Sequence, residues 1–445
     1  MKERYESYKD SGVPWIGQVP AGWEVETFGK HFTFGKGLPI TKADLVPEGI
    51  AVLSYGQIHA KYNRRTTISD NMVRFVLSDF ISTNPKSLLN KGDFVFADTS
   101  EDIDGSGNFG FNDYADDIFA GYHTIIARPI DLAYPKYYAY LFQSRGWKSQ
   151  VQSKVNGVKV YSISKEILKG TSILLPPLPI QRAIADYLDE RCAAIDAYVA
   201  SLEREAGLAR ELKQAVIARA VTRGLDPNTP MRDSGIPWIG QVPQGWEVRR
   251  TKYLAELYTG ESIKDSEKNN YTFPEDAHPY ISSKDINLEY NTIDYENGMY
   301  IKNGDRSFSI AKKGSTLMCI EGGSAGRKKA RLNQDVSFVN KLCCYAPLNI
   351  DGSYLFYFLC SSNFEDEFKR NISGLIGGVP VGILKNIKIP LPPLPEQRAI
   401  ADYLDARCAA IDAYVASIER EATLARELKQ REIADAVTGK VRVAG

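Results

Sequence analysis

Two long segments of this chain occur twice, almost unchanged. The 16 residues DSGVPWIGQVPAGWEV, which begin at Asp10, return from Asp233 with 14 positions identical. The 38 residues from Pro177 to Gln214 return from Pro393 with 34 identical. The offsets of 223 and 216 residues are the size of a domain and far exceed a solenoid unit. The duplication predicts two similar halves related by a pseudo-two-fold axis.

The segments between these near-copies, 26–172 and 249–388, hardly resemble each other. Neutral drift after a duplication is the simplest alternative, but drift would spread the changes evenly along the chain. The repeated parts are therefore expected to meet the same surroundings twice, and the variable parts to meet something different. A duplex with two unlike half-sites fits this expectation, because DNA is itself a pseudo-two-fold object.

The second repeated segment has the pattern of a long coiled-coil helix, preceded by prolines and ended in the first copy by Gly224. Apolar residues every seven positions predict a supercoiled contact with a partner helix. The predicted seam consists of Leu188, Ile195, Leu202, Ala209 and Val216, then Leu404, Ile411, Ile418 and Ala425. About 40 residues give roughly 60 Å of helix, and a turn of B-DNA is about 34 Å. The helix pair could therefore act as a ruler between two DNA-reading domains, or only as an internal brace.

Both variable segments are typical of mixed α/β (α+β) domains. Predicted strands are Ile50–Tyr55, Asp93–Ala97, His123–Ala127, Thr316–Ile320 and Leu342–Tyr345, and predicted helices are Lys136–Ser149 and Tyr354–Arg370. The expected architecture is two recognition domains joined by two long antiparallel helices. Its parts are a first domain at 1–172, a first helix at 173–224, a linker and second domain at 225–388, and a second helix at 389–445.

Polar and basic loops in the variable segments are the candidate DNA contacts, because glycine lets backbone approach a surface and cations suit phosphates or guanine edges. A solvated charged loop is the alternative for each. The candidates in the first domain are Lys61, Tyr62, Asn63, Arg64, Arg65, Thr99, Ser100, Ser106 and Asn108. Those in the second are Lys284, Gly322, Gly323, Ser324, Arg327, Lys328, Lys329 and Arg331.

Several functions lack support in the sequence. The six cysteines and four histidines have no zinc-ligand spacing, so buried reduced thiols are expected. A net charge of zero argues against coating nucleic acid by bulk charge but permits local basic patches. No stretch approaches 18 consecutive apolar residues, and the charged first ten residues lack a signal core, so we expect a cytoplasmic protein without a membrane partner.

Two motifs in one loop are decoys. Gly105-Ser-Gly107-Asn-Phe-Gly110 has dinucleotide-binding spacing, but an acidic loop stands where that motif needs a strand. Asp102 to Asp113 resembles a calcium loop but ends in Asp where a bidentate Glu is expected. No catalytic motif was found. The signature tryptophans, Trp15, Trp23, Trp238 and Trp246, are interpreted as packing elements.

Taken together, the chain resembles the specificity subunits of type I restriction–modification enzymes over essentially its whole length. The motifs that carry the resemblance are the signature before each variable segment, PLPPLPEQRAIADYLD from Pro390, the long helices, and the linker RGLDPNTPMRDS from Arg223 to Ser234. The first copy departs from the pattern only slightly, with Ile180 where the second has Glu396. We expect no functional loss from that difference.

The resemblance implies that each variable domain reads one half of a two-part sequence in double-stranded DNA. It also implies that the helices set the unread spacer and bind two modification subunits, which carry S-adenosylmethionine and methylate adenine. Restriction subunits that use ATP and magnesium would join them. The chain itself is expected to hold no cofactor or metal and to be no enzyme. The opposing hypotheses are a coiled-coil scaffold that binds proteins but not DNA, and a free-standing enzyme that uses the Gly105 loop.

Overall fold

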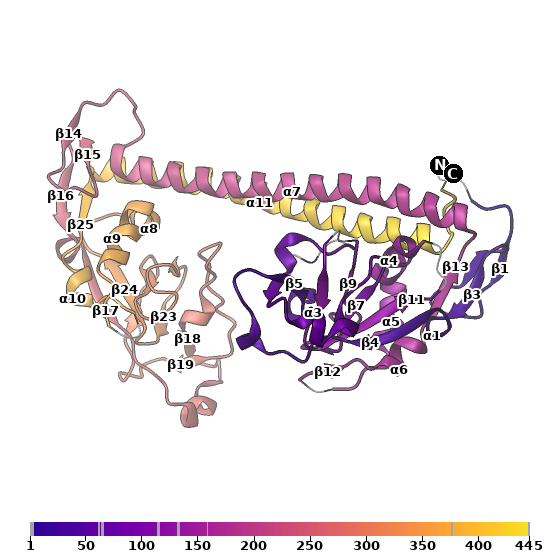
Figure 1. The fold of residues 1–445 in the computed structure, drawn as a ribbon. Helices are drawn as coiled ribbons and strands as arrows, with labels where there is room; N and C mark the ends of the chain where they lie inside the picture. The colour runs from indigo at the N-terminus through magenta and orange to yellow at the C-terminus, as the bar shows by residue number, and fades with distance from the viewer. Residues whose placement is uncertain are drawn as a thin grey trace. The chain divides into compact units, whose positions relative to one another are not determined.

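The computed structural model describes residues 4–60, 63, 66–113, 116–130, 134–157, 159–374 and 377–443. The chain divides into two compact units: unit 1 is Met1–Ser201 with Glu421–Gly445, and unit 2 is Leu202–Arg420. Each unit holds one signature, one variable domain and one half of each long helix (Figure 1). The boundaries drawn from the sequence separated helices from domains, whereas these units group each domain with the helix segments on which it packs.

Unit 1 is built around an antiparallel sheet in the order β4-β11-β7-β9, beside a second sheet, β10-β5-β6. Two-stranded pairs are β1-β2, β13-β3 and β12-β8. The strands are β1 Tyr8–Asp10, β2 Gln18–Pro20, β3 Glu24–Thr27, β4 Phe32–Lys36, β5 Ile50–Leu53, β6 Arg74–Val76, β7 Phe94–Ala97, β8 Thr99–Ser100, β9 Phe109–Phe111, β10 Ile118–Ala120, β11 Thr124–Pro129, β12 Tyr161–Ser162 and β13 Ser172–Leu175. The short helices are α1 Phe28–His31, α2 Tyr55–Ile58, α3 Phe80–Thr83, α4 Pro135–Gln143, α5 Arg145–Gln152 and α6 Lys165–Lys169.

Unit 2 repeats the first of these sheets as β17-β24-β21-β22, again antiparallel throughout, and adds the sheet β19-β18-β23-β20. Two-stranded pairs are β14-β15 and β16-β25. The strands are β14 Met231–Asp233, β15 Gln241–Pro243, β16 Glu247–Arg250, β17 Ala255–Thr259, β18 Ala277–Ile281, β19 Tyr300–Lys302, β20 Ile310–Ala311, β21 Thr316–Cys319, β22 Lys329–Arg331, β23 Val336–Phe338, β24 Leu342–Pro347 and β25 Lys388–Leu391. The short helices are α8 Gly352–Cys360, α9 Ser362–Arg370 and α10 Val381–Leu384.

The five strands predicted in the variable segments are confirmed, but both predicted helices are broken. Ser144 separates α4 from α5, and Ser361 separates α8 from α9. Each serine has an extended backbone, and its hydroxyl accepts the amide hydrogen of the residue three positions later, so it caps the second helix. A serine within a predicted amphipathic helix can therefore mark the point where one helix ends and the next begins.

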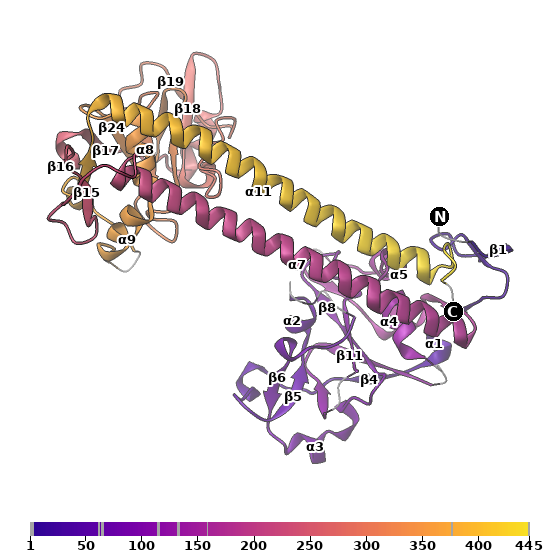
Figure 2. The same cartoon turned by 90° about the horizontal axis from the view of Figure 1, so that it is seen from above.

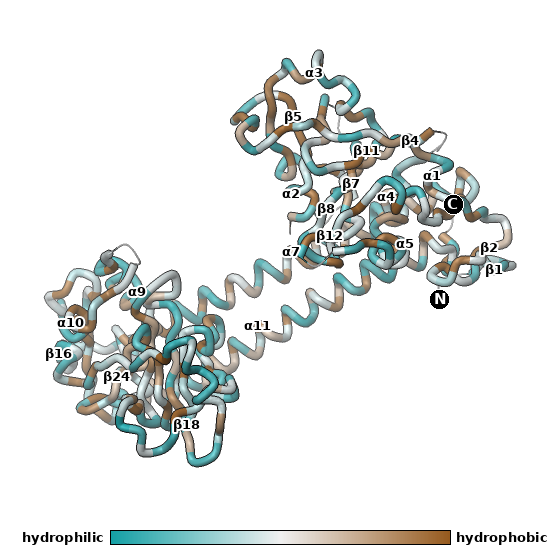
Figure 3. Tube along the Cα trace, turned by 90° about the horizontal axis from the view of Figure 1, so that it is seen from below, coloured by the Kyte–Doolittle hydropathy of each residue, from teal (hydrophilic) through white to brown (hydrophobic). Residues whose placement is uncertain are grey.

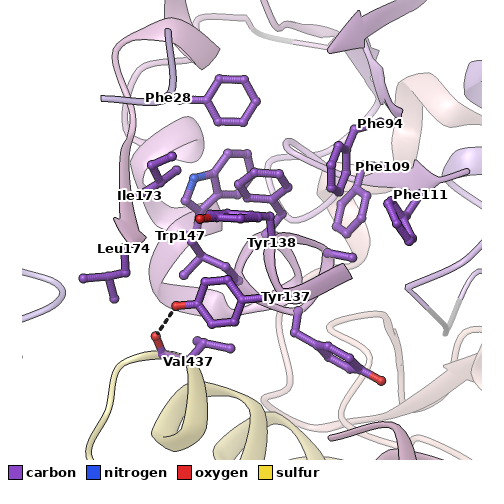
Figure 4. Close-up of a cluster of buried hydrophobic side chains, with 14 of the residues drawn as sticks. Phe28, Phe94, Phe109, Phe111, Tyr137, Tyr138, Trp147, Ile173, Leu174 and Val437 are labelled. Carbon is purple, nitrogen blue, oxygen red and sulfur yellow. Dashed lines mark hydrogen bonds between the residues drawn. The ribbon is translucent and has the colours of Figure 1, made fainter. Parts of the chain in front are cut away.

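The core of unit 1 is aromatic and lies between the sheet and helices α4 and α5. Phe28, Phe94, Phe142 and Trp147 pack with ring centroids 4.5–6.1 Å apart where they touch. Figure 4 shows Phe28, Phe94 and Trp147 of this cluster. Burying such side chains is a main source of stability. Trp23 and Trp246 of the two signatures are also buried, which confirms their packing role. All six cysteines are buried thiols, as predicted.

The two long helices are α7 Leu178–Arg223 and α11 Leu394–Val437. Within each unit they lie side by side and antiparallel (Figures 1 and 2). Lys429 donates to both carboxylate oxygens of Asp196 in unit 1, at 2.8 and 2.7 Å, and Lys213 does the same to Asp412 in unit 2, at 2.7 Å. Hydrophobic and hydrophilic bands alternate along both helices (Figure 3).

The predicted seam is confirmed up to Ala209 and Ala425, where every predicted member is buried. Beyond that point Val216 is only half-buried, and its neighbour Ile217 takes the buried position. In the second helix the two corresponding residues, Glu432 and Ile433, are both buried. The prediction of Val216 is therefore wrong by one residue, because the next buried position after Ala209 in α7 is eight residues on, where a strict heptad has seven.

Candidate nucleic-acid interface

A tight polar loop joins β8 to β9 in unit 1. The Ser100 hydroxyl donates to the Asp102 carbonyl at 2.7 Å, and the Gly105 amide donates to Asp102 Oδ1 at 2.6 Å. A Cβ at Gly105 would lie 2.6 Å from the Ser100 hydroxyl, so any larger residue would have to displace that hydroxyl. The loop is held by its own hydrogen bonds, and it leads into strand β9, whereas the dinucleotide-binding motif opens a helix.

A half-buried polar network connects this loop to helix α5. Lys148 on α5 donates to Asn108 Oδ1 at 2.6 Å, and Asn108 Nδ2 lies 3.3 Å from Nδ1 of His59. His59 Nε2 lies 2.8 Å from the Thr99 carbonyl. Burial lowers the pKa of Lys148 to about 8. Lys148 and His59 are not among the residues predicted from the sequence. They lie 40 and 49 positions from Asn108, and no spacing rule links residues so far apart.

Several residues predicted to contact DNA in unit 1 instead form hydrogen bonds within the domain. Ser100 and Ser106 are buried, and both hydroxyls contact the Asp102 carbonyl, so they shape the loop and do not face a base. Thr99 and Asn108 are half-buried. The amide group of Asn63 donates to the Ile58 and Phe109 carbonyls. Lys61, Tyr62, Arg64 and Arg65 lie outside the described residues.

The exposed tip of the unit 1 loop is acidic. Glu101, Asp102 and Asp104 are all exposed. Carboxylates repel phosphates but accept a hydrogen bond from the N4 amino group of cytosine in the major groove. This loop is therefore suited to contact base edges and not the DNA backbone.

The corresponding loop of unit 2 joins β21 to β22 and is richer in glycine and cations. Gly323 and Arg327 are exposed, and Gly322, Ser324 and Lys328 are half-buried. The Gly322 amide donates to the Gly377 carbonyl at 2.8 Å, which anchors the loop. Lys328 Nζ donates to the Ser283 carbonyl at 2.7 Å, next to the exposed Lys284. The structure thus brings Lys284 and Arg327 to one region of unit 2.

Two of the predicted cations in unit 2 are held by residues of the helices that pack on β22. Lys329 is 1% exposed, and its ammonium contacts Glu365 and the Leu359 carbonyl, each at 2.8 Å. Arg331 contacts Ser353, and lies 3.3 Å from Asp405 on α11. Their prediction as DNA contacts is corrected, because alternate residues of a strand share a face and this face of β22 points at helices. Arg327 remains the strongest candidate for a guanine or phosphate contact.

In the part of the chain that the structure describes, no helix combines the length and apolar character needed to cross a bilayer. Within the same ranges, no group of three or more His, Cys, Asp or Glu side chains is placed to hold a metal ion. The calcium-loop interpretation of 102–113 thus gains no support.

The sequence matches the family described as "Type I restriction modification DNA specificity domain" twice, over residues 20–197 and 243–418. The chain belongs to this family. Its relatives among specificity subunits include the type I restriction enzyme MjaVIII specificity subunit of Methanocaldococcus jannaschii, which is 25% identical over 96% of this chain and 94% of the relative. The EcoKI specificity subunit of Escherichia coli is 22% identical over 71% of this chain and 68% of the relative.

Solved specificity subunits share the fold. A chain from a structure described as the complex assembly and conformational transition of the type I R-M system superposes with a TM-score of 0.71 at 18% identity, covering 94% of this chain and 98% of that one. The HsdS subunit of Thermoanaerobacter tengcongensis gives 0.50 at 19%, covering 95% and 98%. The chain is a DNA-recognition subunit of a type I restriction–modification system and not the catalytic one.

Proposed function

We propose that each recognition domain reads one half of a two-part sequence in double-stranded DNA, and that the helix pair sets the unread spacer between the halves. The observation that carries this proposal is the contrast between a duplicated frame and unlike loops. Both units place a loop at the same edge of the same antiparallel sheet. In unit 1 the tip of this loop exposes three carboxylates, whereas in unit 2 the loop exposes Arg327, directly after Gly326. Groups of opposite charge select different base edges.

The partners belong to the same proposal. Two modification subunits carry S-adenosylmethionine and methylate adenine, and restriction subunits supply ATP- and magnesium-dependent cleavage. This chain needs no cofactor of its own for recognition. The whole assembly acts on DNA in the cytoplasm.

Two equivalent leucine pairs support docking of two identical partners on the long helices. Leu208 and Leu212 of α7 are 59% and 48% exposed, and Leu424 and Leu428 of α11 are 58% and 43% exposed. Each pair is spaced by four residues, so its members share one helix face. Exposed apolar side chains at repeated positions are typical of protein contacts.

The recognition half of the proposal is tested by mapping methylated adenines in cells that express the chain with its partners. We expect a split motif. Replacing residues 26–172 by the variable segment of a relative should change one half of that motif and leave the other unchanged. A single uninterrupted motif, or a swap that alters both halves, contradicts the proposal. Methylation without any motif favours the scaffold that does not bind DNA.

The docking half is tested with two matched double variants, Leu208→Glu/Leu212→Glu and Leu424→Glu/Leu428→Glu. With each double variant, the purified complex should contain one modification subunit in place of two. Native mass spectrometry measures this number directly. The variant with all four substitutions should lose both. Retention of two modification subunits by the fourfold variant would place the docking surface elsewhere.

A further inference from the structure

Two tyrosines of α4 form hydrogen bonds from the recognition domain of unit 1 to both long helices. The Tyr137 hydroxyl donates to the Val437 carbonyl at the end of α11, at 3.0 Å (Figure 4). The Tyr140 hydroxyl donates to Asp189 on α7 at 2.6 Å. Residues three apart lie on one face of a helix, so α4 presents both hydroxyls to the helix pair.

Unit 2 repeats these bonds with the roles of the long helices exchanged. The Tyr354 hydroxyl on α8 lies 3.1 Å from the Val221 carbonyl of α7 and 2.8 Å from the Pro390 carbonyl of β25. The Tyr357 hydroxyl donates to Asp405 on α11 at 2.6 Å. Val221 and Val437, like Asp189 and Asp405, are equivalent positions of the 216-residue repeat.

The surrounding sequence shows how selectively these tyrosines are shared. When α4, PKYYAYLFQ, is aligned with α8, GSYLFYFLC, the two tyrosines are the only identical residues among nine positions. Apolar packing alone would accept Phe at these places, as it does at Phe142 and Phe358 nearby. The shared feature is therefore the hydroxyl. Burial raises the pKa of all four tyrosines, which keeps the hydroxyls protonated as donors.

We propose that Tyr137, Tyr140, Tyr354 and Tyr357 are positioning residues that fix each recognition domain on the helix pair, and so determine which spacer length is accepted. The inference rests on the proposed two-part reading. One bond to one helix leaves a domain able to turn about that contact, whereas bonds to two different helices fix its orientation. The tyrosines lie at the helix pair and not in the loops discussed above, so they set where bases are read and not which bases are read.

The test uses the complete complex with its modification subunits and compares wild type with Tyr137→Phe/Tyr140→Phe and Tyr354→Phe/Tyr357→Phe. Methylation rates are measured on a DNA set with constant half-sites and an unread spacer one base pair shorter, equal or longer. Loss of one buried hydroxyl bond is worth about threefold in an equilibrium, so the loss of two is worth about tenfold. We expect the preference for the correct spacer to fall about tenfold in each double variant, with the half-site sequences unchanged.

Matched controls are Tyr258→Phe and Tyr280→Phe. These hydroxyls donate to the Ile310 and Glu261 carbonyls, at 2.9 and 2.7 Å, inside the second recognition domain. The controls should lose a similar amount of thermal stability and keep the spacer preference. If a double variant does not fold, the single variants Tyr140→Phe and Tyr357→Phe carry the test.

Two outcomes overturn the proposal. If the double variants lose stability as the controls do but keep the full spacer preference, the four tyrosines have only a structural role. Variants that change the bases read place these tyrosines in base recognition instead. A wild-type complex that recognises no split site contradicts the proposed function itself, and this result is visible before any variant is compared.

Discussion

The two recognition domains use the same sheet and the same attachment to the long helices, but different chemistry holds their loops. The fourth residue of α5 is Lys148, and the fourth residue of α9 is Glu365. In unit 1 the lysine donates to Asn108, which in turn contacts His59, whereas in unit 2 the glutamate pairs with the buried Lys329. A loop at a fixed place can therefore rest on unrelated polar networks, provided that each is fully bonded.

The junctions of the long helices with the signatures differ as well. In unit 2 the chain continues from α7 through a linker to the signature, and Trp246 Nε1 donates to Glu396 at 3.1 Å. In unit 1 the end of α11 meets the signature without a covalent link, through the Tyr8 hydroxyl and the Gly439 carbonyl at 3.0 Å. Ile180 replaces the glutamate there. The two junctions are thus held by different contacts, although the signatures and the helices that meet there are nearly identical in sequence.

The largest expected difference concerns the buried ion pair of unit 2. Glu365→Ala leaves the Lys329 ammonium buried with only a carbonyl partner, and removing one member of a buried pair costs about 3 kcal/mol. Hydrogen exchange measured on peptides from each unit separates the two, since it reports the free energy of local opening. Unit 2 should lose this stability and unit 1 should not. A loss below about 1 kcal/mol would show that water already screens the pair.

The second prediction concerns Lys148, whose pKa of about 8 lies below the ordinary value of 10.5. The unfolded chain binds more protons than the folded one between these values, so the stability of unit 1 rises with pH in this window. Each pKa unit corresponds to about 1.4 kcal/mol, which gives a gain of about 2 kcal/mol between pH 8 and pH 10. The gain should be absent in Lys148→Met, and the difference between the two proteins is the quantity to measure. Equal pH profiles would mean that the ammonium is well hydrated.

The sequence predicted the frame well, because the frame is written as long periodic patterns. The duplication, the heptads and the alternating apolar strands each extend over many residues, so single errors do not alter the conclusion. The errors lie at single positions. The sequence predicted Val216 as the buried position, whereas the structure buries its neighbour Ile217. The buried positions Ala209 and Ile217 are eight residues apart, and the heptad predicts seven.

The candidate interface was harder to predict, because a cation's role depends on which way it points. Arg327 and Lys329 are two residues apart, yet one is exposed and the other buried. Strand alternation separates Lys329 from the loop only once the start of β22 is known. The partners of Lys329 and Lys148 come from other elements, so local sequence cannot reveal them.

The third prediction compares the glycines that end the long helices. Gly224 and Gly439 have φ values of 72° and 70°, a conformation that costs other residues about 1 kcal/mol or more. A Cβ at Gly439 would also lie 2.5 Å from the Pro20 ring, whereas at Gly224 the nearest atom is the mobile end of Glu396 at 3.1 Å. Gly439→Ala should therefore destabilise unit 1 by about 1.5 kcal/mol, more than Gly224→Ala destabilises unit 2. Calorimetry of both variants checks the order, and a reversed order contradicts the packing argument.

The smallest expected effect comes from copying unit 1 into unit 2 at one position. Glu396→Ile gives α11 the residue that α7 has at Ile180, and it removes the acceptor of the buried Trp246 indole N–H. The lost bond costs about 1 kcal/mol, partly offset by the added apolar contact. Glu396→Gln keeps an acceptor and should be nearly neutral. Urea unfolding followed through tryptophan fluorescence compares the two. If Glu396→Ile is as stable as Glu396→Gln, the indole bond contributes nothing, and the two junctions differ in sequence without differing in strength.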